Sequence, residues 1–450
     1  MTTLTPTTQV LSSRKLMRLV AVSVALAICI TAQGQGRDIS FLYNADASKF
    51  APQTPPIPVF IEGGTLIDGT GAAPLQNPGI LITGGIIQLG NTSPLPENTR
   101  LIDARGKWIL PGMFDLHAHL TFYLPGGFHS ESDVIASLRA ERFLEHYQSI
   151  GVTTVCDVAS RADTGYSMKH AQRLGLMKGS RLYVSGPGIT VTGGHPTEFQ
   201  PFEESQYGVE SDGPWALRSS VREAVKKGAD FIKVFPPLAA EEYQAVVDEA
   251  HAWKLRVTSH AGGIQDPSGT STQRSVQAGV DSIHHLYPYG DNPDRTIAEM
   301  AKRSTYVIPT IGYHMREVSG NAHLSNTWME SNLGHNEENV RRNFRSLQEA
   351  GIKFGVGTES NPFDMLNIDE IYAQELEGFV RSGISPLQTI QSATLHSADA
   401  FGLAEQTGSI ETGKWGDVII LSSDPLENIR ALVEPELVIQ GGEVVYRKER

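Results

Sequence analysis

Short apolar runs alternate with amphipathic segments along residues 110–403. The segments between the runs carry apolar residues at helical spacing, as in 132–151 and 239–254, and Ser385 followed by Pro386 predicts a further helix start. The apolar runs lie at 114–120, 152–158, 181–186, 230–235, 256–261, 280–286, 306–310 and 352–358. Eight strands in alternation with helices are typical of a (β/α)₈ or TIM barrel. The pattern therefore predicts an α/β fold with a barrel over residues 110–403.

Strand-like patterns of a different kind occupy both ends of the chain. Apolar runs separated by Gly, Pro and Asn turns fill residues 59–108 and predict a small antiparallel sheet. Similar runs lie at 416–425 and 435–448. Because the two ends share this style, we expect residues 59–109 and 404–450 to build one composite β-sandwich domain beside the barrel.

The first residues differ from the rest of the chain. Three basic residues within 14–18 precede an apolar run at 19–30, which gives way to small and polar residues. This order is typical of a secretory signal peptide, and the run is short for a membrane span, although a retained anchor is the alternative. We expect residues 1–36 to be a signal peptide and 37–58 a proline-rich, extended lead-in. The mature protein would then be periplasmic or secreted, without stable membrane association.

Composition and charge exclude some classes of partner and chemistry. The 450 residues are 40 % hydrophobic and 19 % charged, as in an ordinary globular protein. Losing three basic and no acidic residues with 1–36 takes the net charge from −13 to −16, which argues against nucleic acid as a partner. Cys156 would be the remaining cysteine, so no internal disulfide forms. Its place in an apolar run favours a buried structural thiol over a nucleophile.

Polar side chains stand near the ends of the predicted barrel strands, where the active sites of such barrels lie. His117 and His119 are two residues apart on one strand, so both rings face the same side with Cα atoms roughly 7 Å apart. The other candidates near strand ends are Lys233, His260, His284, His285 and Glu359. Because barrel strands end around one mouth, we expect these side chains to converge on a metal site.

Each candidate also has an ordinary structural explanation. An H-x-H pair can arise by chance, and a single histidine such as His260 is typical of a hydrogen-bonded core residue. Lys233 is harder to explain, because an ammonium group buried without a partner is costly, although a structural ion pair would satisfy it. Adjacent residues of a strand face opposite ways, so we expect only one of His284 and His285 to join the centre. The coincidence of all these residues at strand ends favours the metal site.

Several motifs together resemble the amidohydrolase superfamily. "LPGMFDLHAHL" is similar to its first-strand signature, and the lysine of "DFIKVF" lies on the fourth predicted strand. With "SHA", "GVDSIHH", "GTES" and the tail "ATLHSADAFGLAEQTGSIETGKWGDVIIL", the chain resembles the imidazolonepropionase-like and prolidase-like branch. The motifs are specific jointly and weak singly, and the resemblance runs from about residue 59 to the end.

The resemblance implies a binuclear metal centre. His117 and His119 would bind one divalent ion, and His260 and His285 would bind a second. Lys233 would react with CO₂ through its neutral amine, and the carbamate would bridge both ions. Zinc is the usual ion of imidazole-rich sites, with manganese, iron and cobalt as alternatives.

The implied chemistry is hydrolysis by a hydroxide that bridges the two ions and attacks a polarised amide carbonyl. Glu359, near the ions as a further ligand, would take the water's proton and pass it to the leaving amine. The family usually carries Asp at this position, and the extra methylene moves the carboxylate by about 1–1.5 Å, a scale at which misplacement costs about 10²-fold in rate. Either the backbone has adjusted to the longer side chain or activity is reduced. Adjustment is favoured because every other expected ligand position carries a suitable residue. His284 stands where the branch tends to have Glu, and we expect it to face away from the centre and pack in the core.

Substrate contacts are predicted more loosely. His195 lies in "GITVTGGHP", which resembles a loop of the branch that overhangs the site, so it would hydrogen-bond the scissile carbonyl or a substrate carboxylate; a structural loop histidine is the alternative. Tyr287 and Tyr289 follow the sixth predicted strand. Tyr287 would line the substrate pocket, with aromatic packing as the alternative for both.

These features predict an exported metal-dependent hydrolase that cleaves amide bonds of dipeptides or N-acyl amino acids. Hydrolysis of a carboxylic ester or lactone at the same site is the first alternative. A metal-binding homologue with impaired catalysis, motivated by Glu359, is the second. The substrate would be a small molecule, and homo-oligomer formation is an expectation by analogy with other barrels.

Overall fold

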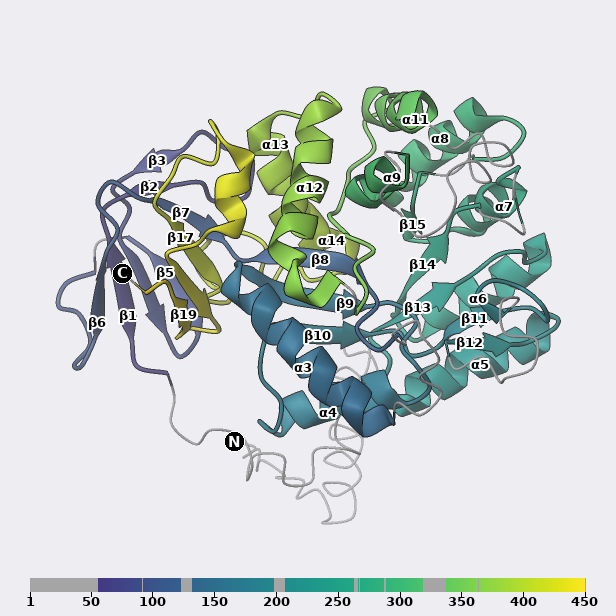
Figure 1. The fold of residues 1–450 in the computed structure, drawn as a ribbon, viewed down its shortest axis with the longest axis horizontal. Helices are drawn as coiled ribbons and strands as arrows, with labels where there is room; N and C mark the ends of the chain where they lie inside the picture. Colours follow the sequence, from purple (N-terminus) through teal and green to yellow (C-terminus); the bar gives the residue numbers. More distant parts are fainter. Residues whose placement is uncertain are drawn as a thin grey trace, which may run out of the picture. The chain divides into compact units, whose positions relative to one another are not determined.

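The computed structural model describes residues 56–90, 92–122, 132–197, 207–262, 266, 268–286, 289–318, 337–362 and 364–449 (Figure 1). All of them belong to one unit, residues 47–450. The predicted signal peptide at 1–36 and all but the last residues of the predicted lead-in at 37–58 lie outside the described residues, as does Tyr287. Within the described ranges, every helix is too short or too polar to cross a lipid bilayer.

Parallel strands alternate with helices in the middle of the chain, as predicted. One parallel sheet has the order β10-β9-β8, and a second has the order β12-β11-β13-β14-β15-β16. The strands are β8 Met113–Ala118, β9 Val152–Asp157, β10 Arg181–Val184, β11 Gly188–Thr190, β12 Gly208–Glu210, β13 Phe231–Val234, β14 Arg256–His260, β15 Ser282–His284 and β16 Tyr306–Ile308. Each of the first seven predicted runs overlaps one of these strands, whereas β11 and β12 were not predicted.

Backbone hydrogen bonding also links the two parallel sheets. The Asp230 amide, just before β13, donates to the carbonyl oxygen of Val184 at the end of β10 (2.8 Å). The Asp230 carboxylate in turn accepts a hydrogen bond from the Val184 amide (2.9 Å). The end of β10 is thereby tied to the start of β13.

The run at 352–358 is not a strand, which corrects the prediction of an eighth one. It forms an isolated bridge of Phe354 with Val307, and a second bridge joins Ser360, just beyond the run, to Ala118. Backbone hydrogen bonds still tie it to both neighbours, since the Gly355 amide donates to Val307 (3.0 Å) and the Leu116 amide donates to Val356 (2.9 Å). The segment has glycines where neighbours press closely: a Cβ atom on Gly357 would lie 2.5 Å from Ile308 Cγ2 and 2.7 Å from His117 Cβ. These hydrogen bonds and bridges, without the continuous pairing of a strand, still join the segment to β8 and β16.

Helices connect the strands and continue beyond them. They are α3 Asp133–Ser149, α4 Thr164–Arg173, α5 Pro214–Lys227, α6 Ala240–Ala252, α7 Thr270–Ala278, α8 Pro293–Arg303, α9 Ile311–Val318, α11 Glu337–Glu349, α12 Ile368–Arg381, α13 Pro386–Gln391 and α14 Ser397–Ala400. The helices predicted in 132–151 and 239–254 are confirmed as α3 and α6. The predicted start at Ser385 is confirmed too, since its hydroxyl accepts from the Gln388 amide and Pro386 opens α13.

Both ends of the described chain contribute to a pair of mixed sheets. Their orders are β5-β4-β1-β6 and β19-β18-β17-β7-β2-β3. The strands are β1 Val59–Glu62, β2 Thr65–Leu66, β3 Leu75–Gln76, β4 Ile80–Thr83, β5 Ile86–Leu89, β6 Arg100–Asp103, β7 Trp108–Pro111, β17 Val418–Leu421, β18 Leu437–Gln440 and β19 Glu443–Arg447. The N-terminal strands do not form the purely antiparallel sheet that we predicted, because β1 and β6 run parallel.

The two ends meet in the second of these sheets. Strand β7, near the N-terminal side, pairs antiparallel with β17 (purple-blue and yellow in Figure 1). Ile61 of β1, Ile109 of β7 and Ile420 of β17 are buried in one hydrophobic cluster between the sheets. Burial of branched side chains from both ends couples them, at about 25 cal/mol per Å² of apolar surface removed from water.

Cys156 is buried on β9 among apolar side chains. Burial raises the pKa of its thiol well above the usual value. A protonated, enclosed thiol is a poor nucleophile, so the prediction of a structural cysteine is confirmed.

Candidate metal centre

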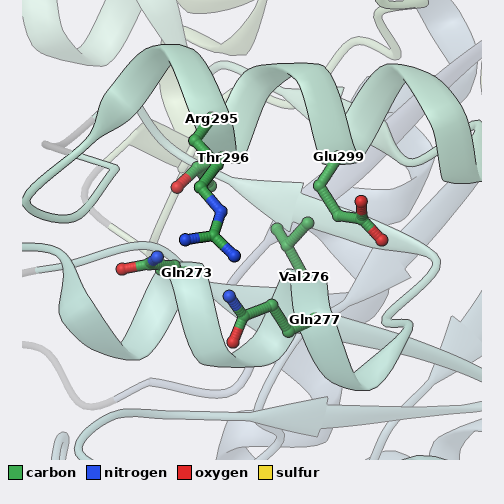
Figure 2. Close-up of a pocket in the computed structure, with 6 residues that line it drawn as sticks. All are labelled: Gln273, Val276, Gln277, Arg295, Thr296 and Glu299. Atoms are coloured by element: carbon green, nitrogen blue, oxygen red, sulfur yellow. The ribbon is translucent and has the colours of Figure 1, made fainter.

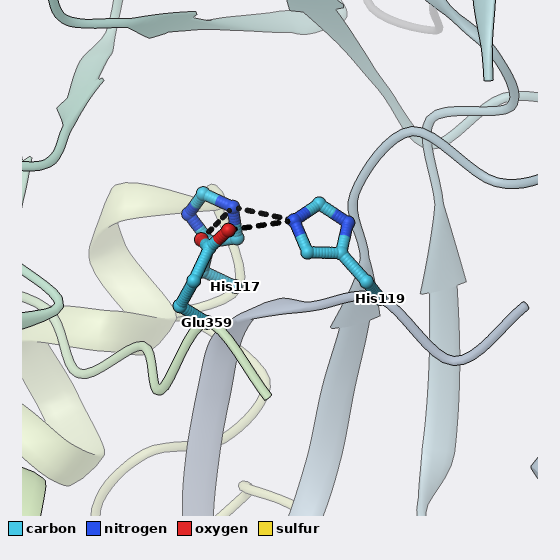
Figure 3. Close-up of side chains that lie close together, drawn as sticks. All are labelled: His117, His119 and Glu359. Atoms are coloured by element: carbon cyan, nitrogen blue, oxygen red, sulfur yellow. Dashed lines mark hydrogen bonds and ion pairs between the residues drawn. The ribbon is translucent and has the colours of Figure 1, made fainter. Parts of the chain in front are cut away.

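His117, His119 and Glu359 come together where β8 ends (Figure 3). Glu359 Oε2 lies 2.7 Å from His117 Nε2, and Glu359 Oε1 lies 3.2 Å from His119 Nε2. The two Nε2 atoms are themselves 3.2 Å apart. Two imidazole nitrogens and a carboxylate at this spacing form a ligand set for a transition-metal ion such as zinc.

A buried carboxylate places Glu359 against β8. Asp115, which is fully buried, accepts hydrogen bonds from the His117 amide (3.0 Å) and from the Thr358 amide (3.1 Å) and hydroxyl (2.6 Å). The Glu359 amide donates to the His117 carbonyl oxygen (2.8 Å). These contacts hold the backbone of Glu359, which has a φ of 57°, a conformation uncommon outside glycine.

Tyr147 of α3 completes this support. Its hydroxyl donates to Asp115 Oδ2 (2.8 Å) and contacts the Ser360 hydroxyl. Burial raises the pKa of Asp115 to about 6, although its hydrogen bonds oppose the rise, so the carboxylate is ionised at neutral pH. The position of Glu359 thus depends on residues far away in the sequence.

We predict that Tyr147→Phe lowers the free energy of unfolding by about 1.5–3 kcal/mol, because hydrogen bonds to charged groups contribute that much. Urea unfolding measures the change. Tyr446→Phe on β19, a partly exposed tyrosine, is the control and should stay within about 0.5 kcal/mol of the parent protein. Equal stability of the Tyr147 variant and the parent would show that this hydroxyl does not support the site.

His285 brings the end of β15 to the same centre. Its ring centroid lies 4.8 Å from that of His117 and 4.3 Å from that of His260, which ends β14. His285 Nε2 is 3.8 Å from Glu359 Oε2, while its Nδ1 contacts the Thr310 hydroxyl (2.8 Å). The imidazoles predicted for two ions therefore form one continuous cluster.

His284 corrects the expectation that only one of the two adjacent histidines faces the centre. It is fully buried, and its Nδ1 lies 2.6 Å from His117 Nδ1. Strand β15 ends at His284, and His285 adopts a φ of 80°. This left-handed conformation breaks the alternation of a strand, so both rings turn to the same side.

Lys233 lies on β13 with 1 % of its surface exposed. Its Nζ makes no hydrogen bond with any residue that the structure describes, and it lies 4.9 Å from the Phe235 ring centroid. Burial lowers the pKa of its amine to about 7. An unsatisfied amine with a pKa near neutrality is partly uncharged at neutral pH, which fits a group that CO₂ could carboxylate. Among the described residues it makes no structural ion pair.

The cluster supplies neutral donors and one anion. Burial lowers the pKa of His117 to about 4, and it lowers the pKa values of His260 and His285 well below the usual imidazole range. Burial alone would raise the pKa of Glu359, but positive charge on the imidazoles around it, when they are protonated, and the hydrogen bond from His117 outweigh burial and hold that pKa well below its usual value. A bound metal ion would take the place of that positive charge. Neutral nitrogens and an ionised carboxylate are the protonation states that metal binding requires.

His195 lies beside the cluster, as the loop prediction required. Its ring centroid is 4.9 Å from that of His260 and 5.1 Å from that of Phe235. The His195 amide donates to the Pro236 carbonyl oxygen (3.0 Å), which ties the loop to the end of β13. Tyr289 is buried and its hydroxyl donates to the His285 carbonyl oxygen (3.1 Å), so it packs behind the site and does not line a pocket.

Two supporting residues escaped the sequence reasoning. Thr310 faces His285, and the Leu286 amide donates to His314 Nε2 (3.3 Å) on α9. The segment "IPTIGYHM" carries a polar residue at the end of β16, which is the signal that could have pointed to Thr310. Nothing in the sequence pattern distinguishes His314 from an ordinary helix residue.

A hollow of about 400 Å³ lies elsewhere, between α7 and α8 (Figure 2). Gln273, Val276 and Gln277 face Arg295, Thr296 and Glu299 across it. It contains none of the clustered histidines, and its amide and charged side chains are typical of a solvated helix surface. The metal-ligand cluster remains the candidate site.

Comparison with known proteins gives one family and several relatives. The model of the "Amidohydrolase family" matches residues 108–445. An ochratoxinase from Aspergillus niger is 26 % identical over 428 residues, which cover 84 % of each chain. An imidazolonepropionase from Acidiphilium cryptum is 25 % identical over 435 residues, 87 % of this chain and 95 % of the relative.

Among solved structures, one of a Xaa-Pro dipeptidase with methionine bound in its active site is similar. The TM-score is 0.74 at 26 % identity, and the match covers 87 % of this chain and 100 % of the other. The likeness implies a TIM-barrel-type fold with a second domain, as predicted.

Proposed function

This chain belongs to the amidohydrolase family, hydrolases of carbon–nitrogen bonds, and on that premise we propose that it cleaves the amide bond of dipeptides or N-acyl amino acids in a metal-dependent reaction. The observation that carries the proposal is the cluster of buried imidazoles around Glu359, with its neutral donors. Relatives named ochratoxinase and imidazolonepropionase, and a neighbour named Xaa-Pro dipeptidase, support a small-molecule substrate.

The ligand set that we propose accommodates two divalent ions, most simply zinc. His117 and His119 would hold one ion, His260 and His285 the other, and a carbamate on Lys233 would bridge them. Such ions supply a Lewis acid for the amide carbonyl and lower the pKa of water to about 7. The lowered pKa and missing hydrogen bond of Lys233 support the carbamate, because CO₂ adds to a neutral amine.

Glu359 would act as proton carrier and as a further ligand. Its carboxylate is held ionised, so it can accept the proton of the attacking water. The same oxygen would then give that proton to the leaving amine nitrogen, which otherwise departs as an unfavourable amide anion. Its contacts with His117 and His119 support this role, because they fix the carboxylate on the ligand side of the cluster.

His195 would contact the substrate. Its ring stands beside His260 on a loop tied to the end of β13, which suits a donor to the scissile carbonyl or to a substrate carboxylate. Tyr287, proposed as a second substrate contact, is two residues after His285 in the sequence.

We predict that hydrolysis depends on bound metal. Dialysis against a chelator should abolish turnover of an amide panel of dipeptides and N-acyl amino acids, and zinc with bicarbonate should restore it. Metal analysis of each sample by mass spectrometry follows the ions directly. Full turnover by protein from which both ions have been removed would refute a metal-dependent reaction.

Ester and lactone substrates in the same panel test the nearest alternative. We expect higher kcat/KM for amides, because a proton carrier is needed most where the leaving group is a poorly stabilised amine. Higher values for esters or lactones would replace the proposal with that alternative. Bound metal without turnover of any member would favour the catalytically impaired homologue.

Export of the protein is part of the proposal. The basic and apolar segment before residue 36 supports a signal peptide. We expect N-terminal sequencing of the protein from its native host to begin near residue 37, in a periplasmic or secreted fraction. An intact N-terminus in the cytoplasmic fraction would contradict export.

A further inference from the structure

His117 is contacted through both of its ring nitrogens. Its Nε2 faces Glu359 and His119, at 2.7 and 3.2 Å (Figure 3). Its Nδ1, on the opposite edge of the ring, lies 2.6 Å from Nδ1 of His284. All of these side chains except Glu359 are buried, so no bulk water reaches between the two imidazoles.

A proton must lie between the two Nδ1 atoms. Two bare nitrogens at 2.6 Å would repel each other through their lone pairs, and two N–H groups would clash. For His117 to offer its Nε2 lone pair to a metal ion, its single proton must be on Nδ1. Nδ1 of His284 is then the acceptor, and the proton of His284 is on Nε2, whose described neighbour is the Ser282 hydroxyl at 3.5 Å.

We infer that His284 is a positioning residue that fixes the Nδ1–H tautomer and the ring orientation of His117, so that His117 Nε2 binds metal. The inference rests on the proposed metal-dependent function. His284 is not itself a ligand in this arrangement, because its Nδ1 is engaged by His117 and its other nitrogen faces Ser282. It acts as a supporting partner of a ligating histidine usually does, but through a neutral imidazole where a carboxylate or carbonyl is more common.

The backbone conformation of His285 explains how the adjacent His284 and His285 can both contact the cluster. The left-handed backbone of His285 turns its ring towards His260 and Glu359 while His284, the last residue of β15, points at His117. One strand end therefore supplies a ligand and the support for a ligand on a different strand.

Metal affinity tests this inference without any measurement of turnover. In His284→Leu the acceptor is lost, and we expect the affinity for one of the two ions to fall by about 10–100-fold in competition with a chromophoric chelator. His284→Asn keeps an acceptor oxygen close to the place of Nδ1 and should recover most of that loss. His170→Leu on α4, an exposed histidine, is the matched control and should bind as the parent does.

Equal affinity of His284→Leu and the parent, or an Asn variant as weak as the Leu variant, would overturn the inference. If the Leu variant does not fold, ¹⁵N shifts of labelled histidine in the zinc-loaded parent decide the matter, because without metal His117 Nε2 lies within hydrogen-bonding distance of the Glu359 carboxylate. We expect the Nδ1–H tautomer for His117 and the Nε2–H tautomer for His284, whereas Nε2–H on His117 would refute it. Affinity that depends on His284 in a protein without turnover would refute only the proposed function.

Discussion

Replacing Lys233 by alanine is expected to remove most of the bound metal and to lower kcat/KM by about 10²-fold or more. Loss of residues that merely support a ligand already costs about 10–100-fold, and a bridge contacts both ions directly. The Lys233 side chain is buried on β13, and its amine makes no hydrogen bond to any described residue. Its removal breaks no hydrogen bond to a described residue, only the contact with the Phe235 ring. A loss of metal by a folded variant would therefore be attributable to the bridge.

Metal content by mass spectrometry and kcat/KM on the amide panel measure the effect. Acetate or propionate should restore part of both in Lys233→Ala, because a free carboxylate fits the volume vacated by the side chain and supplies the bridging anion. Lys302→Ala, which changes a lysine that is 76 % exposed on α8, is the matched control and should leave both unchanged.

The opposite result is equally informative. Two tightly bound ions in Lys233→Ala, with no response to added carboxylate, would show that the carbamate is not part of the centre. Lys233 would then be a buried neutral amine, tolerated at the cost of its depressed pKa.

The site residues near strand ends could be predicted because each apolar run, and the polar residue near its end, can be recognised from a few neighbouring positions in the sequence. β8, β13 and β14 each read as a short apolar run with one basic or imidazole side chain near its end. Parallel strands joined by helices bring such ends to the same edge. Convergence of His117, Lys233 and His260 therefore followed without knowledge of any distance.

Backbone conformations and long-range networks could not be predicted in the same way. The period of a strand places His284 and His285 on opposite sides, and only the positive φ of His285 reverses that. Asp115 reads as one polar residue in an apolar run, although it binds Tyr147 and Thr358, 32 and 243 positions away. The residues 352–358 read as a strand because their composition does not reveal how closely β8 and β16 press on Gly357.

Glu359 was predicted as the carboxylate of the site, but the sequence did not show whether its longer side chain places the carboxylate correctly. The backbone at 358–360 is tied to β8 through Asp115 and through the contact of the Glu359 amide with His117. From that fixed backbone the carboxylate touches both His117 and His119. From this backbone position the longer side chain reaches both imidazoles. This favours a site whose backbone has adjusted to Glu359 over a site with reduced activity.

We predict that Glu359→Gln lowers kcat by about 10²–10⁴-fold, the range that a general acid–base group contributes. The amide keeps the size of the side chain but can neither accept the water's proton nor return it to the amine. Single-turnover kinetics on the best amide substrate measure the chemical step, and metal analysis separates loss of the proton carrier from loss of an ion. Glu405→Gln, at an exposed glutamate, is the control.

Glu359→Asp separates the position of the carboxylate from its charge. The shorter side chain withdraws the carboxylate by about 1–1.5 Å, so we expect kcat to fall by up to about 10²-fold, less than in the Gln variant. An Asp variant as active as the parent would mean that the backbone around Thr358 shifts to compensate, despite its hydrogen bonds with Asp115. A fully active Gln variant would mean that another group moves the proton, and His195, whose ring lies beside His260, would become the residue to test.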